Sequence, residues 1–458
     1  MAGQGKSRES RIAIVGAGPA GLSAGYFLKK KGYKNVTIFE RLGRVGGMCC
    51  SITEDGESFD IGANYVTPSY REVMKLAREY DADMYVERPE GCVQFDENST
   101  GDPKEVPIIK AVMAGTPWYT FFFAAFKYLW LRWRLSSIID PAGLKNISKH
   151  PELCISFEEW LKQHNLLCLK KTFEVPITVM GYGYLDEIAA PYALKYMDVP
   201  TFWFMARRAL PVIGELVPWP KRFIKGFQRL WQKVAWDLNV RTNTNITSIH
   251  RSDEGVEIKF EYEEQILSTT RVKKREMKFD YVIIACRLDL DVLEKFMPDL
   301  HENERKIWKK IQTNSYCLAS FNVRNFSPRE PITCTIPLTP FGTPWAATKQ
   351  FPDSDMVQFY VRAKSEPSDE DVEKEITEKV QEFVAKWKDA KIDENKWITY
   401  DRWPYFQHVC ADDMKDGFYD ELEGLQGERR TFYTGAAMNF ELVEKVVEYS
   451  KALVKREF

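Results

Sequence analysis

The sequence has few of the residues from which metal centres and disulfide frameworks are built. Its 458 residues include five histidines, at positions 150, 164, 250, 301 and 408, and no two of them are close enough for a His-x3-His metal pair. Its nine cysteines have no repeated spacing, which favours free thiols in a reducing compartment. We therefore predict neither a metal site nor a disulfide framework.

The net charge is also small, and long apolar runs are few. The 64 lysines and arginines nearly balance 66 acidic residues and leave a net charge of -2, which argues against nucleic-acid binding through bulk positive charge. The uncharged stretch from Ala111 to Phe126 is shorter than the ~20 residues of a membrane-spanning helix and contains Gly115 and Pro117. The polar segment from Met1 to Ser10 lacks an apolar secretion signal, so we expect a cytoplasmic protein.

The sequence does contain a dinucleotide motif near its start. The apolar run Ile12–Val15 predicts a buried parallel strand, and residues 16–21 that follow, GAGPAG, fit the pattern G-x-G-x-x-G. The first glycine permits a tight turn, the second lets the backbone approach a pyrophosphate, and the third lets helix and strand pack closely. A helical segment then ends at Lys29–Lys31, and a second strand, Val36–Phe39, ends at Glu40. The Glu40 carboxylate suits a ribose diol and repels a 2′-phosphate, which argues against NADP.

A second glycine-rich segment indicates which dinucleotide is bound. The segment RLGRVGGM, from Arg41 to Met48, is similar to the second glycine signature of FAD enzymes with the glutathione-reductase-type fold. Its paired Gly46 and Gly47 would let the chain pass close beneath the cofactor. No second G-x-G-x-x-G follows a strand, so we predict no separate NAD(P)H domain and a flavin that the substrate itself reduces. No cysteine or histidine signature for covalent attachment is present, which predicts non-covalent FAD.

The remaining pattern predicts an α/β protein whose FAD-binding domain is discontinuous. Strand-like runs return at residues 239–249, 256–260, 279–285 and 430–436. We expect a Rossmann-like FAD-binding domain of the glutathione-reductase type, a mixed-sheet substrate domain and a helical, aromatic-rich insertion. Their predicted bounds are residues 1–75, 225–290 and 405–458 for the first, 76–100 and 291–404 for the second, and 101–224 for the third.

Taken together, these motifs resemble the amine-oxidase-type FAD flavoproteins. The resemblance is clearest at residues 11–49, 181–196, 403–408 and 423–433. Within the family, the sequence is similar to bacterial polyunsaturated fatty acid isomerases and, more weakly, to β-cyclopiazonate dehydrogenase. The resemblance implies that flavin N5 removes a hydride from an activated C–H of a hydrophobic or lipid substrate, and that in the isomerases the hydride returns to another carbon. Such chemistry suits a site without a catalytic histidine, metal or nucleophile.

Two departures from the family pattern are visible. The isomerases hold a substrate carboxylate with an arginine, and the corresponding place falls near Gly91 and Cys92, with Arg88 close but unmatched. This departure weighs against a free fatty acid as substrate. Many relatives follow the C-terminal glycine with glutamate, whereas here Gly435 is followed by Ala436. Because the backbone N–H can still serve the pyrophosphate, the prediction of FAD stands.

The candidate site residues form two groups. The predicted cofactor-binding residues lie in the glycine motifs and in later returning segments: Gly16, Gly18, Pro19, Ala20, Gly21, Glu40, Arg41, Gly46, Gly47, Met48, Gly62, Ala63, Asn64, Val240 and Gly435. The predicted substrate pocket, which rests on the resemblance, consists of Met180, Tyr182, Tyr184 and Phe204. Aromatic side chains at such positions equally serve as ordinary core. We interpret His408 as structural, and likewise the two consecutive cysteines Cys49 and Cys50.

Several functional hypotheses remain open from the sequence. The first is a flavoenzyme that isomerises or oxidises a hydrophobic substrate; the others are an amine oxidase or oxidative cyclase that uses O2, and a flavin-binding protein without turnover. Nine aromatic residues between Pro117 and Arg134 bear on the choice: Trp118, Tyr119, Phe121, Phe122, Phe123, Phe126, Tyr128, Trp130 and Trp133. With interleaved cations they fit a substrate channel or its mouth near a membrane, and also a plain helical core. The oligomeric state is not predicted.

Overall fold

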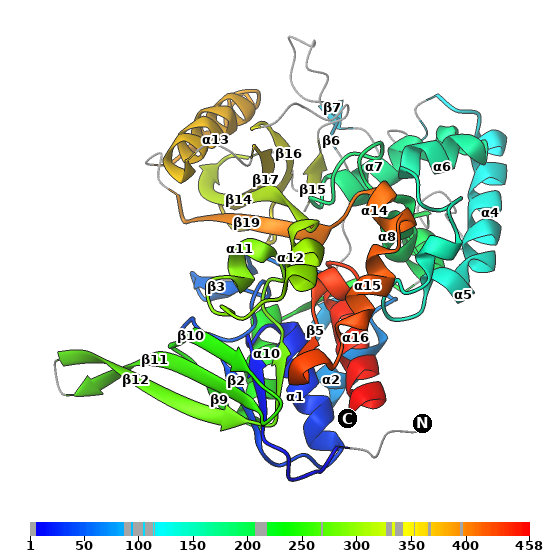
Figure 1. Cartoon of the computed structure of the whole chain (residues 1–458). Coiled ribbons are helices and arrows are strands. Elements are labelled where there is room, and N and C mark those ends of the chain that lie inside the picture. The colour runs from blue at the N-terminus through cyan, green and yellow to red at the C-terminus, as the bar shows by residue number, and fades with distance from the viewer. Residues whose placement is uncertain are drawn as a thin grey trace.

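Two large sheets, a three-stranded meander, three two-stranded pairs and a group of helices make up the described part of the chain (Figure 1). The computed structural model describes residues 6–86, 93–94, 104–105, 113, 115–206, 218–266, 269–326, 332–334, 342–351, 353–364, 368–393 and 397–458. The segment around Gly91 and Cys92, where a carboxylate-binding arginine was sought, lies outside the described residues, as does Arg88.

A five-stranded parallel sheet of strand order β20-β13-β1-β2-β9 forms the base of the dinucleotide region. Its strands are β1 (Ile12–Val15), β2 (Val36–Phe39), β9 (Val240–Arg241), β13 (Tyr281–Ile284) and β20 (Thr431–Tyr433). Most of their residues are buried, as in parallel sheets that are covered on both faces. Because neighbouring strands come from distant parts of the chain, the sheet is discontinuous in sequence, and the predicted α/β fold class is confirmed.

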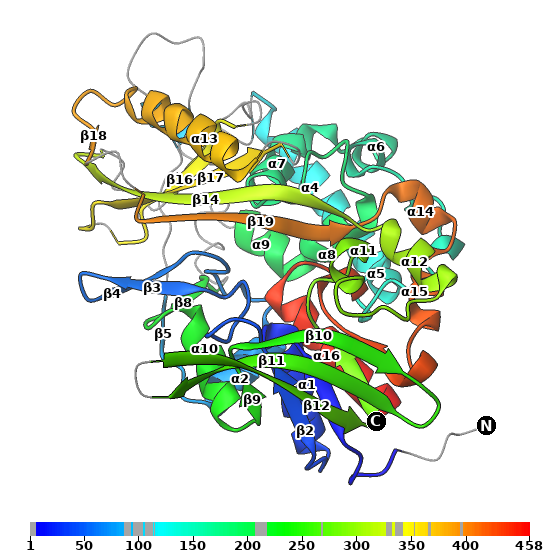
Figure 2. The same ribbon diagram turned by 60° about the vertical axis from the view of Figure 1, so that its left-hand side comes forward.

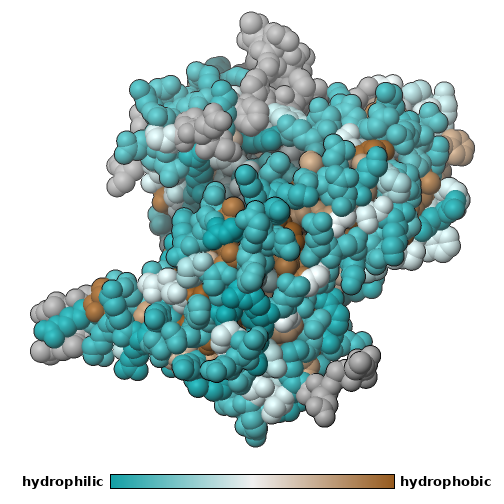
Figure 3. Space-filling model, viewed as in Figure 1, coloured by the Kyte–Doolittle hydropathy of each residue, from teal (hydrophilic) through white to brown (hydrophobic). Residues whose placement is uncertain are grey.

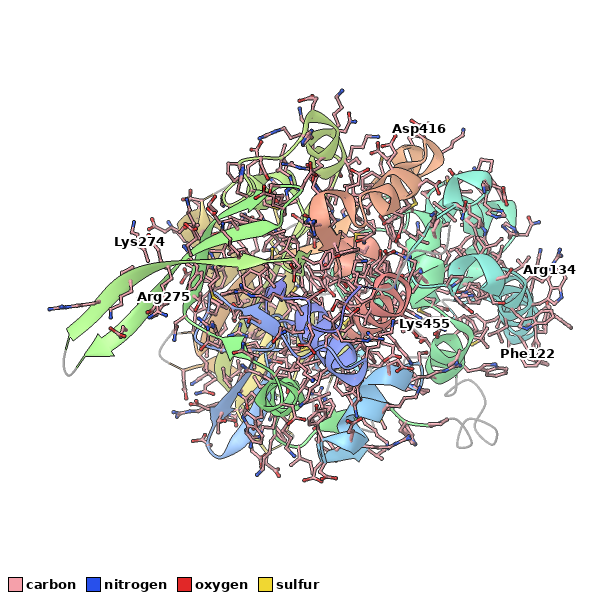
Figure 4. The ribbon with its side chains drawn as sticks, turned by 60° about the horizontal axis from the view of Figure 1, so that its bottom comes forward. Phe122, Arg134, Lys274, Arg275, Asp416 and Lys455 are labelled. Carbon is pink, nitrogen blue, oxygen red and sulfur yellow. The ribbon has the colours of Figure 1, made fainter. Side chains whose placement is uncertain are left out.

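Different layers cover the two faces of this sheet. On one side α1 (Pro19–Lys30) packs against α16 (Val443–Glu457) and α10 (Phe227–Trp236). On the other side lies an antiparallel meander of β10 (Thr244–Arg251), β11 (Val256–Ile266) and β12 (Thr269–Phe279). The ring of Phe39 in β2 lies 5.1 Å from Phe260 and 5.9 Å from Phe279, which joins the meander to the sheet. The far ends of β11 and β12 project from the body, where Figure 4 labels Lys274 and Arg275.

The second sheet is built from β15 (Ile332–Cys334), β16 (Pro344–Thr348), β17 (Met356–Ala363), β14 (Gln312–Arg324) and β18 (Lys391–Ile392), with β19 (Thr399–His408) also paired to β14. All of its described strand pairings are antiparallel, so the sheet that the sequence predicts as mixed is antiparallel in the described residues. Helix α13 (Asp369–Val384) covers one face with the buried side chains of Val372, Ile376, Val380 and Phe383. The pattern of Ser368 followed three residues later by Asp371 predicts a helix start, and in the structure the Ser368 hydroxyl caps α13 by accepting the Asp371 N–H.

The hairpin β3 (Ser51–Glu54) and β4 (Glu57–Asp60) lies between the two sheets, as Figure 2 shows. Buried Asp60, at the end of β4, connects the hairpin to the elements on both sides of it. The Asp60 carboxylate accepts the Phe227 N–H at 2.8 Å, at the start of α10. Its backbone carbonyl accepts amide N–H groups of Gln350 at 2.8 Å and Gln358 at 3.1 Å, from the second sheet. Asp60 therefore joins the hairpin to α10 and to the second sheet.

The remaining elements are mostly helices, and a group of them lies on the right in Figure 1. They include α4 (Trp118–Arg134), α5 (Ser136–Ile139), α6 (Phe157–Gln163), α7 (Lys170–Thr178), α8 (Ala190–Tyr196) and α9 (Val199–Ala206). The others are α2 (Arg71–Glu79), α11 (Leu290–Leu293), α12 (Glu302–Lys309), α14 (Ala411–Lys415), α15 (Phe418–Gly424) and the short strands β5 (Met84–Val86), β6 (Val93–Gln94), β7 (Lys104–Glu105) and β8 (Lys221–Phe223). Among the described residues, none of the helices has the length and apolarity that crossing a bilayer requires.

Candidate cofactor and substrate site

The turn between β1 and α1 has the shape of an anion-binding loop. Gly16 has a φ of +105°, and a Cβ on Gly21 would lie 1.9 Å from the Gly16 carbonyl oxygen, so both positions require glycine. At Gly18, by contrast, a Cβ would meet nothing nearer than the Gly47 Cα, at 3.7 Å. No side chain caps the N-terminus of α1, where Pro19 occupies the first turn. The free N–H groups of this turn and the small residues around them fit a pyrophosphate.

Glu40 fixes the same loop from the end of β2. Its half-buried carboxylate accepts the Ala17 N–H at 2.8 Å with one oxygen and the Leu42 N–H at 2.8 Å with the other. The Glu40 backbone N–H donates to the Arg241 carbonyl at 2.8 Å, which places β9, with half-buried Val240, beside it. Glu40, the predicted ribose ligand, and Val240, a predicted cofactor-binding residue, thus lie at one corner of the sheet. The side chain of Arg41 is exposed at this corner.

The second glycine-rich segment passes over the first. Gly47 has a φ of +54°, and a Cβ on it would lie 3.0 Å from the Gly18 Cα. The Gly46 N–H donates to the Ala17 carbonyl at 2.9 Å, which fixes this crossing. A cofactor phosphate that passes between such loops can approach backbone from both sides. We therefore find that the residues present fit the predicted dinucleotide.

The loop Gly62–Asn64 continues this surface toward the second sheet. A Cβ on Gly62 would lie 1.9 Å from the Met48 carbonyl oxygen, and the Ala63 N–H donates to that oxygen at 3.2 Å. The Asn64 side-chain amide donates to the hydroxyl of Tyr360 in β17 at 3.2 Å. Met48 and all three loop residues are half-buried. This is where the glycine-rich segments meet the proposed substrate sheet.

An aromatic surface extends from that meeting point, and we name it the tyrosine wall: Tyr360, Tyr316, Tyr405 and Tyr182. Successive ring centroids are 6.2 Å apart for Tyr360 and Tyr316, 5.4 Å for Tyr316 and Tyr405, and 5.6 Å for Tyr405 and Tyr182. The Tyr182 hydroxyl donates to the Glu441 carbonyl at 2.9 Å, just before α16. The wall therefore links three strands of the second sheet to the C-terminal segment.

The structure places the four predicted substrate residues at different distances from this wall. Tyr182 belongs to it, and half-buried Tyr184 lies beside it, with its ring 5.6 Å from Trp345 and 5.1 Å from the Arg362 guanidinium. Met180 is half-buried and adjoins Gly181, where a Cβ would lie 2.8 Å from the Tyr316 ring. Phe204 is half-buried on α9, the helix that packs against α4, and no described contact joins it to the wall.

Sequence reasoning missed Tyr316, Tyr360 and Trp345 as candidate site residues. Most residues on both faces of their strands are buried, so no regular exposed side marks the opposite side as the site. Odd-numbered β14 residues such as Cys317 and Phe321 pack toward α13, whereas Tyr316 and Leu318 form the opposite face with Tyr360. Period-two alternation could have separated these two faces, but it could not have said which one meets the cofactor.

The C-terminal segment returns to the same region after β20. Gly435 is buried with a φ of +130°, and the preceding Thr434 N–H donates to the Ile284 carbonyl at 3.0 Å, beside β13. Glu444 in the first turn of α16 was also missed by the sequence reasoning. Its carboxylate accepts three backbone N–H groups at the start of α2, from Arg71, Glu72 and Val73, at 2.7 to 2.9 Å. The start of α2 is thereby tied to the last helix.

Burial favours the neutral forms of the titratable groups of this region. It raises the pKa of Tyr360 to about 12 and those of Tyr182 and Tyr405 well above their ordinary range. Burial also raises the pKa of Glu441 to about 7, although backbone N–H groups of residues 406 and 407 oppose the shift. His408 has its pKa lowered by burial, and its ring stacks on Phe406 at 4.6 Å, as a structural histidine would. Cys49 and Cys50 are free, buried thiols.

Comparison with known proteins agrees with this arrangement. The structure of a CLA-producing fatty acid isomerase from P. acnes is 27% identical, with a TM-score of 0.79 over 99% of this chain and 100% of that one. A putrescine oxidase structure, 15% identical with a TM-score of 0.67 over 98% of each chain, shares the fold.

Curated relatives match over shorter stretches. The polyenoic fatty acid isomerase of Ptilota filicina is 44% identical over 70 residues, which is 15% of this chain and 14% of the relative. The FAD-dependent oxidoreductase dpasF of Apiospora sacchari is 24% identical over 298 residues, 62% of this chain and 59% of the relative. The chain thus matches less than two thirds of the length of these curated relatives.

The family assignment rests on a longer match. The sequence profile described as flavin containing amine oxidoreductase matches residues 19–445, which include the end of the first glycine-rich segment, the whole of the second, the second sheet and the start of α16. Since this match spans most of the chain, the chain belongs to the flavin-containing amine oxidoreductase family.

Proposed function

We propose that this chain is an FAD-dependent enzyme that takes a hydride from an activated C–H of a hydrophobic substrate and isomerises the double bonds of a polyunsaturated fatty acid. The observation that carries the proposal is the tyrosine wall, a neutral aromatic surface that begins where Asn64 meets Tyr360, beside the predicted flavin loops. The full-length likeness to a fatty acid isomerase supports it. The domain bounds given above and a cytoplasmic location remain part of the proposal.

The residues of the chain would divide the work between holding the cofactor and holding the substrate. Gly18, Gly47 and the start of α1 would bind the pyrophosphate, and Glu40 the ribose. FAD supplies the hydride acceptor when it is bound, so the protein does not need its own acid or base at the reacting carbon. The tyrosine wall would orient an apolar chain and exclude water from it, because its rings are neutral and mostly buried.

The decisive experiment separates isomerisation from net oxidation. The purified yellow protein is mixed anaerobically with a polyunsaturated fatty acid, and the conjugated-diene absorbance and the flavin absorbance are followed together. Diene formation with the flavin still oxidised supports the isomerase. A protein that cannot be reconstituted with FAD would contradict the whole proposal. Acid precipitation that releases the flavin into the supernatant would support non-covalent binding.

A matched pair of variants tests the tyrosine wall. Tyr405 is the half-buried member of the wall, whereas the other three are buried, so we choose it for substitution. If the wall acts through its apolar surface, Tyr405→Phe retains diene formation within about threefold, whereas Tyr405→Ser lowers it by about tenfold or more. Flavin content, read from the visible spectrum, should stay equal in both variants. Equal loss of activity in Tyr405→Phe and Tyr405→Ser would instead indicate that the hydroxyl takes part.

A second candidate function is an FAD-dependent dehydrogenase or oxidative cyclase. The observation that favours it is the match to dpasF, which spans 62% of this chain, whereas the polyenoic fatty acid isomerase matches 15%. In the same anaerobic experiment this activity would bleach the flavin without diene formation, and only O2 or another acceptor would restore the colour. An amine oxidase would respond in this way to amines. A flavin that no substrate class bleaches and that forms no diene indicates flavin binding without turnover.

A further inference from the structure

The outer side of α4 carries an aromatic surface that the cofactor and substrate site does not use. Seven side chains form this aromatic face of α4, and they are 37% to 71% exposed: Trp118, Tyr119, Phe122, Phe123, Phe126, Trp130 and Trp133. At about 100° per residue they occupy a single arc of roughly 140° around the helix. The buried Phe121, Ala124, Tyr128 and Arg132 lie on the opposite side. Only two of the nine aromatic residues noted in the sequence, Phe121 and Tyr128, are core.

The figures locate this face at the rim of the molecule. Figure 4 shows Phe122 and Arg134 at the outer edge, on the side of α4 that faces away from the body. In Figure 3 most of the visible surface is hydrophilic, whereas the right-hand edge over α4 is pale to tan. Soluble proteins rarely leave a continuous apolar surface of this size exposed unless it binds something.

The charges on α4 identify the kind of partner. Lys127 and Arg134 lie at one edge of the aromatic arc, and the Arg134 guanidinium sits 4.8 Å from the Trp130 ring centroid. The third cation, Arg132, is buried and donates to the Leu194 carbonyl at 2.7 Å. The α4 sequence contains no Asp or Glu. The exposed face is therefore apolar with a positively charged edge.

We propose that the aromatic face of α4 docks on a membrane surface that contains anionic phospholipid. Tryptophan and tyrosine prefer the boundary between headgroups and acyl chains, and a helix with an apolar arc flanked by cations lies in that plane. A 17-residue helix is about 25 Å long, which is shorter than the ~30 Å hydrocarbon core of a bilayer. Such a helix can lie along the membrane surface but is too short to cross it. A second copy of α4 would supply no carboxylate for Lys127 and Arg134, whereas anionic headgroups would. This inference is independent of the proposed reaction.

Vesicle co-sedimentation of the flavin-loaded protein tests the proposal. The vesicles consist of phosphatidylcholine alone or of an equimolar mixture of phosphatidylcholine and phosphatidylserine. The wild-type protein should bind the mixed vesicles, and the triple variant Trp118→Ser/Phe123→Ser/Trp133→Ser should lose at least about tenfold in partition coefficient. The variant Lys127→Gln/Arg134→Gln should lose about fivefold for each cation removed, and less at high salt. These side chains are exposed, so thermal unfolding and flavin content should not change.

A control outside α4 makes the result specific. Trp236 on α10 is 68% exposed, similar to the 66% of Trp133, so Trp236→Ser removes an equally exposed indole elsewhere. Its vesicle binding should equal that of the wild type. Three outcomes would overturn the proposal: absence of binding to the mixed vesicles, binding that Trp236→Ser weakens as much as the triple variant does, or a wild-type dimer by light scattering that the triple variant abolishes without any vesicle binding. Equal binding to both kinds of vesicle would contradict the role of the anionic lipid.

Discussion

Gly18 and Gly21 differ in what a side chain at each position would meet. A Cβ on Gly18 finds its nearest neighbour 3.7 Å away, and the φ of −77° at Gly18 suits any residue. A Cβ on Gly21 would collide with the Gly16 carbonyl at 1.9 Å. We therefore expect Gly18→Ala to fold normally but to lose FAD, because the new methyl group points to where the pyrophosphate would pass. Gly21→Ala should reduce the yield of folded protein itself.

The measurement for this pair is the flavin-to-protein absorbance ratio together with far-UV circular dichroism. Gly424→Ala is the control, since a Cβ at Gly424 meets nothing within 4 Å and the position lies in α15. It should leave both quantities unchanged. If Gly18→Ala retained a full complement of FAD, the assignment of this loop to the pyrophosphate would be wrong.

Glu441 gives a pH-dependent prediction. Burial raises its pKa to about 7 from an ordinary 4.5, so its protonated form is favoured by folding. Below pH 4.5 the carboxyl is protonated in both states and the stabilisation is complete; it is lost as the pH rises through 7. The advantage of the wild type over Glu441→Gln in free energy of unfolding should therefore decrease across this range, by on the order of 3 kcal/mol.

Urea unfolding at several pH values checks the Glu441 prediction. Burial also raises the pKa values of Asp60 to about 6 and of Glu444 to about 7, so both groups titrate in the same pH range in both proteins. Only the difference in free energy of unfolding between wild type and Glu441→Gln is therefore informative. A difference that stays constant from pH 4.5 to 7 would show that the pKa of Glu441 is not raised by folding.

At the level of elements, α2 depends on a carboxylate from the other end of the chain. Tyr70 at its N-cap provides no side-chain hydrogen bond, and Glu444 of α16 accepts the first three N–H groups instead. Glu444→Ala would leave the Glu72 and Val73 N–H groups without this acceptor, whereas the Arg71 N–H also donates to the Ser69 carbonyl at 3.0 Å. The variant should lower the free energy of unfolding by about 2 kcal/mol or more. Glu448→Ala on the same helix removes one partly buried ion pair with Lys445 but leaves no backbone N–H group without its acceptor, so it should lower the free energy of unfolding by less than Glu444→Ala does.

Equal losses for Glu444→Ala and Glu448→Ala in denaturant titration would mean that the long-range cap contributes nothing. The sequence could not predict this cap, because the capping residue lies more than 370 positions from the helix it caps. The local cap of α13 by Ser368 was predictable, since donor and acceptor lie three residues apart in a recognisable pattern. Local geometry, then, was readable from the sequence, and contacts between distant elements were not.

The same limit applies to the candidate site. The glycine positions follow from the backbone geometry of a βαβ unit, so G-x-G-x-x-G and Glu40 could be interpreted from their spacing alone. The tyrosine wall could not, because its members come from β14, β17, β19 and the segment around Tyr182, and their proximity arises from the pairing of β14 with both β17 and β19. The aromatic cluster of α4 was visible in the sequence, but only burial separates its exposed face from its core face.

At the level of the whole molecule, Arg251 joins three separate segments. Its side chain is 1% exposed in β10, and its guanidinium binds Glu304 of α12 with contacts of 2.6 and 3.0 Å and Asp299 at 3.0 Å. The Tyr433 hydroxyl, from β20, donates to Glu304 at 3.1 Å. Burial alone would raise the pKa of Glu304, but hydrogen bonds from Arg251 hold it below its ordinary value. The meander, α12 and the edge of the parallel sheet are therefore connected through one buried ion network.

Removing Arg251 alone should lower the free energy of unfolding more than removing Arg251 and Glu304 together. Arg251→Met leaves Glu304 buried without its bidentate partner and should lower the free energy of unfolding by about 3 to 5 kcal/mol. In Arg251→Met/Glu304→Met the uncompensated charge is gone, while Asp299 keeps Arg429 at 3.1 Å, so most of that loss should be recovered. Arg324→Met, which breaks a pair with a 66% exposed arginine side chain, should change stability by less than about 1 kcal/mol. Urea unfolding followed by circular dichroism and by flavin fluorescence measures all three. If the double variant were no more stable than Arg251→Met, the connection would depend on packing rather than on the buried charge.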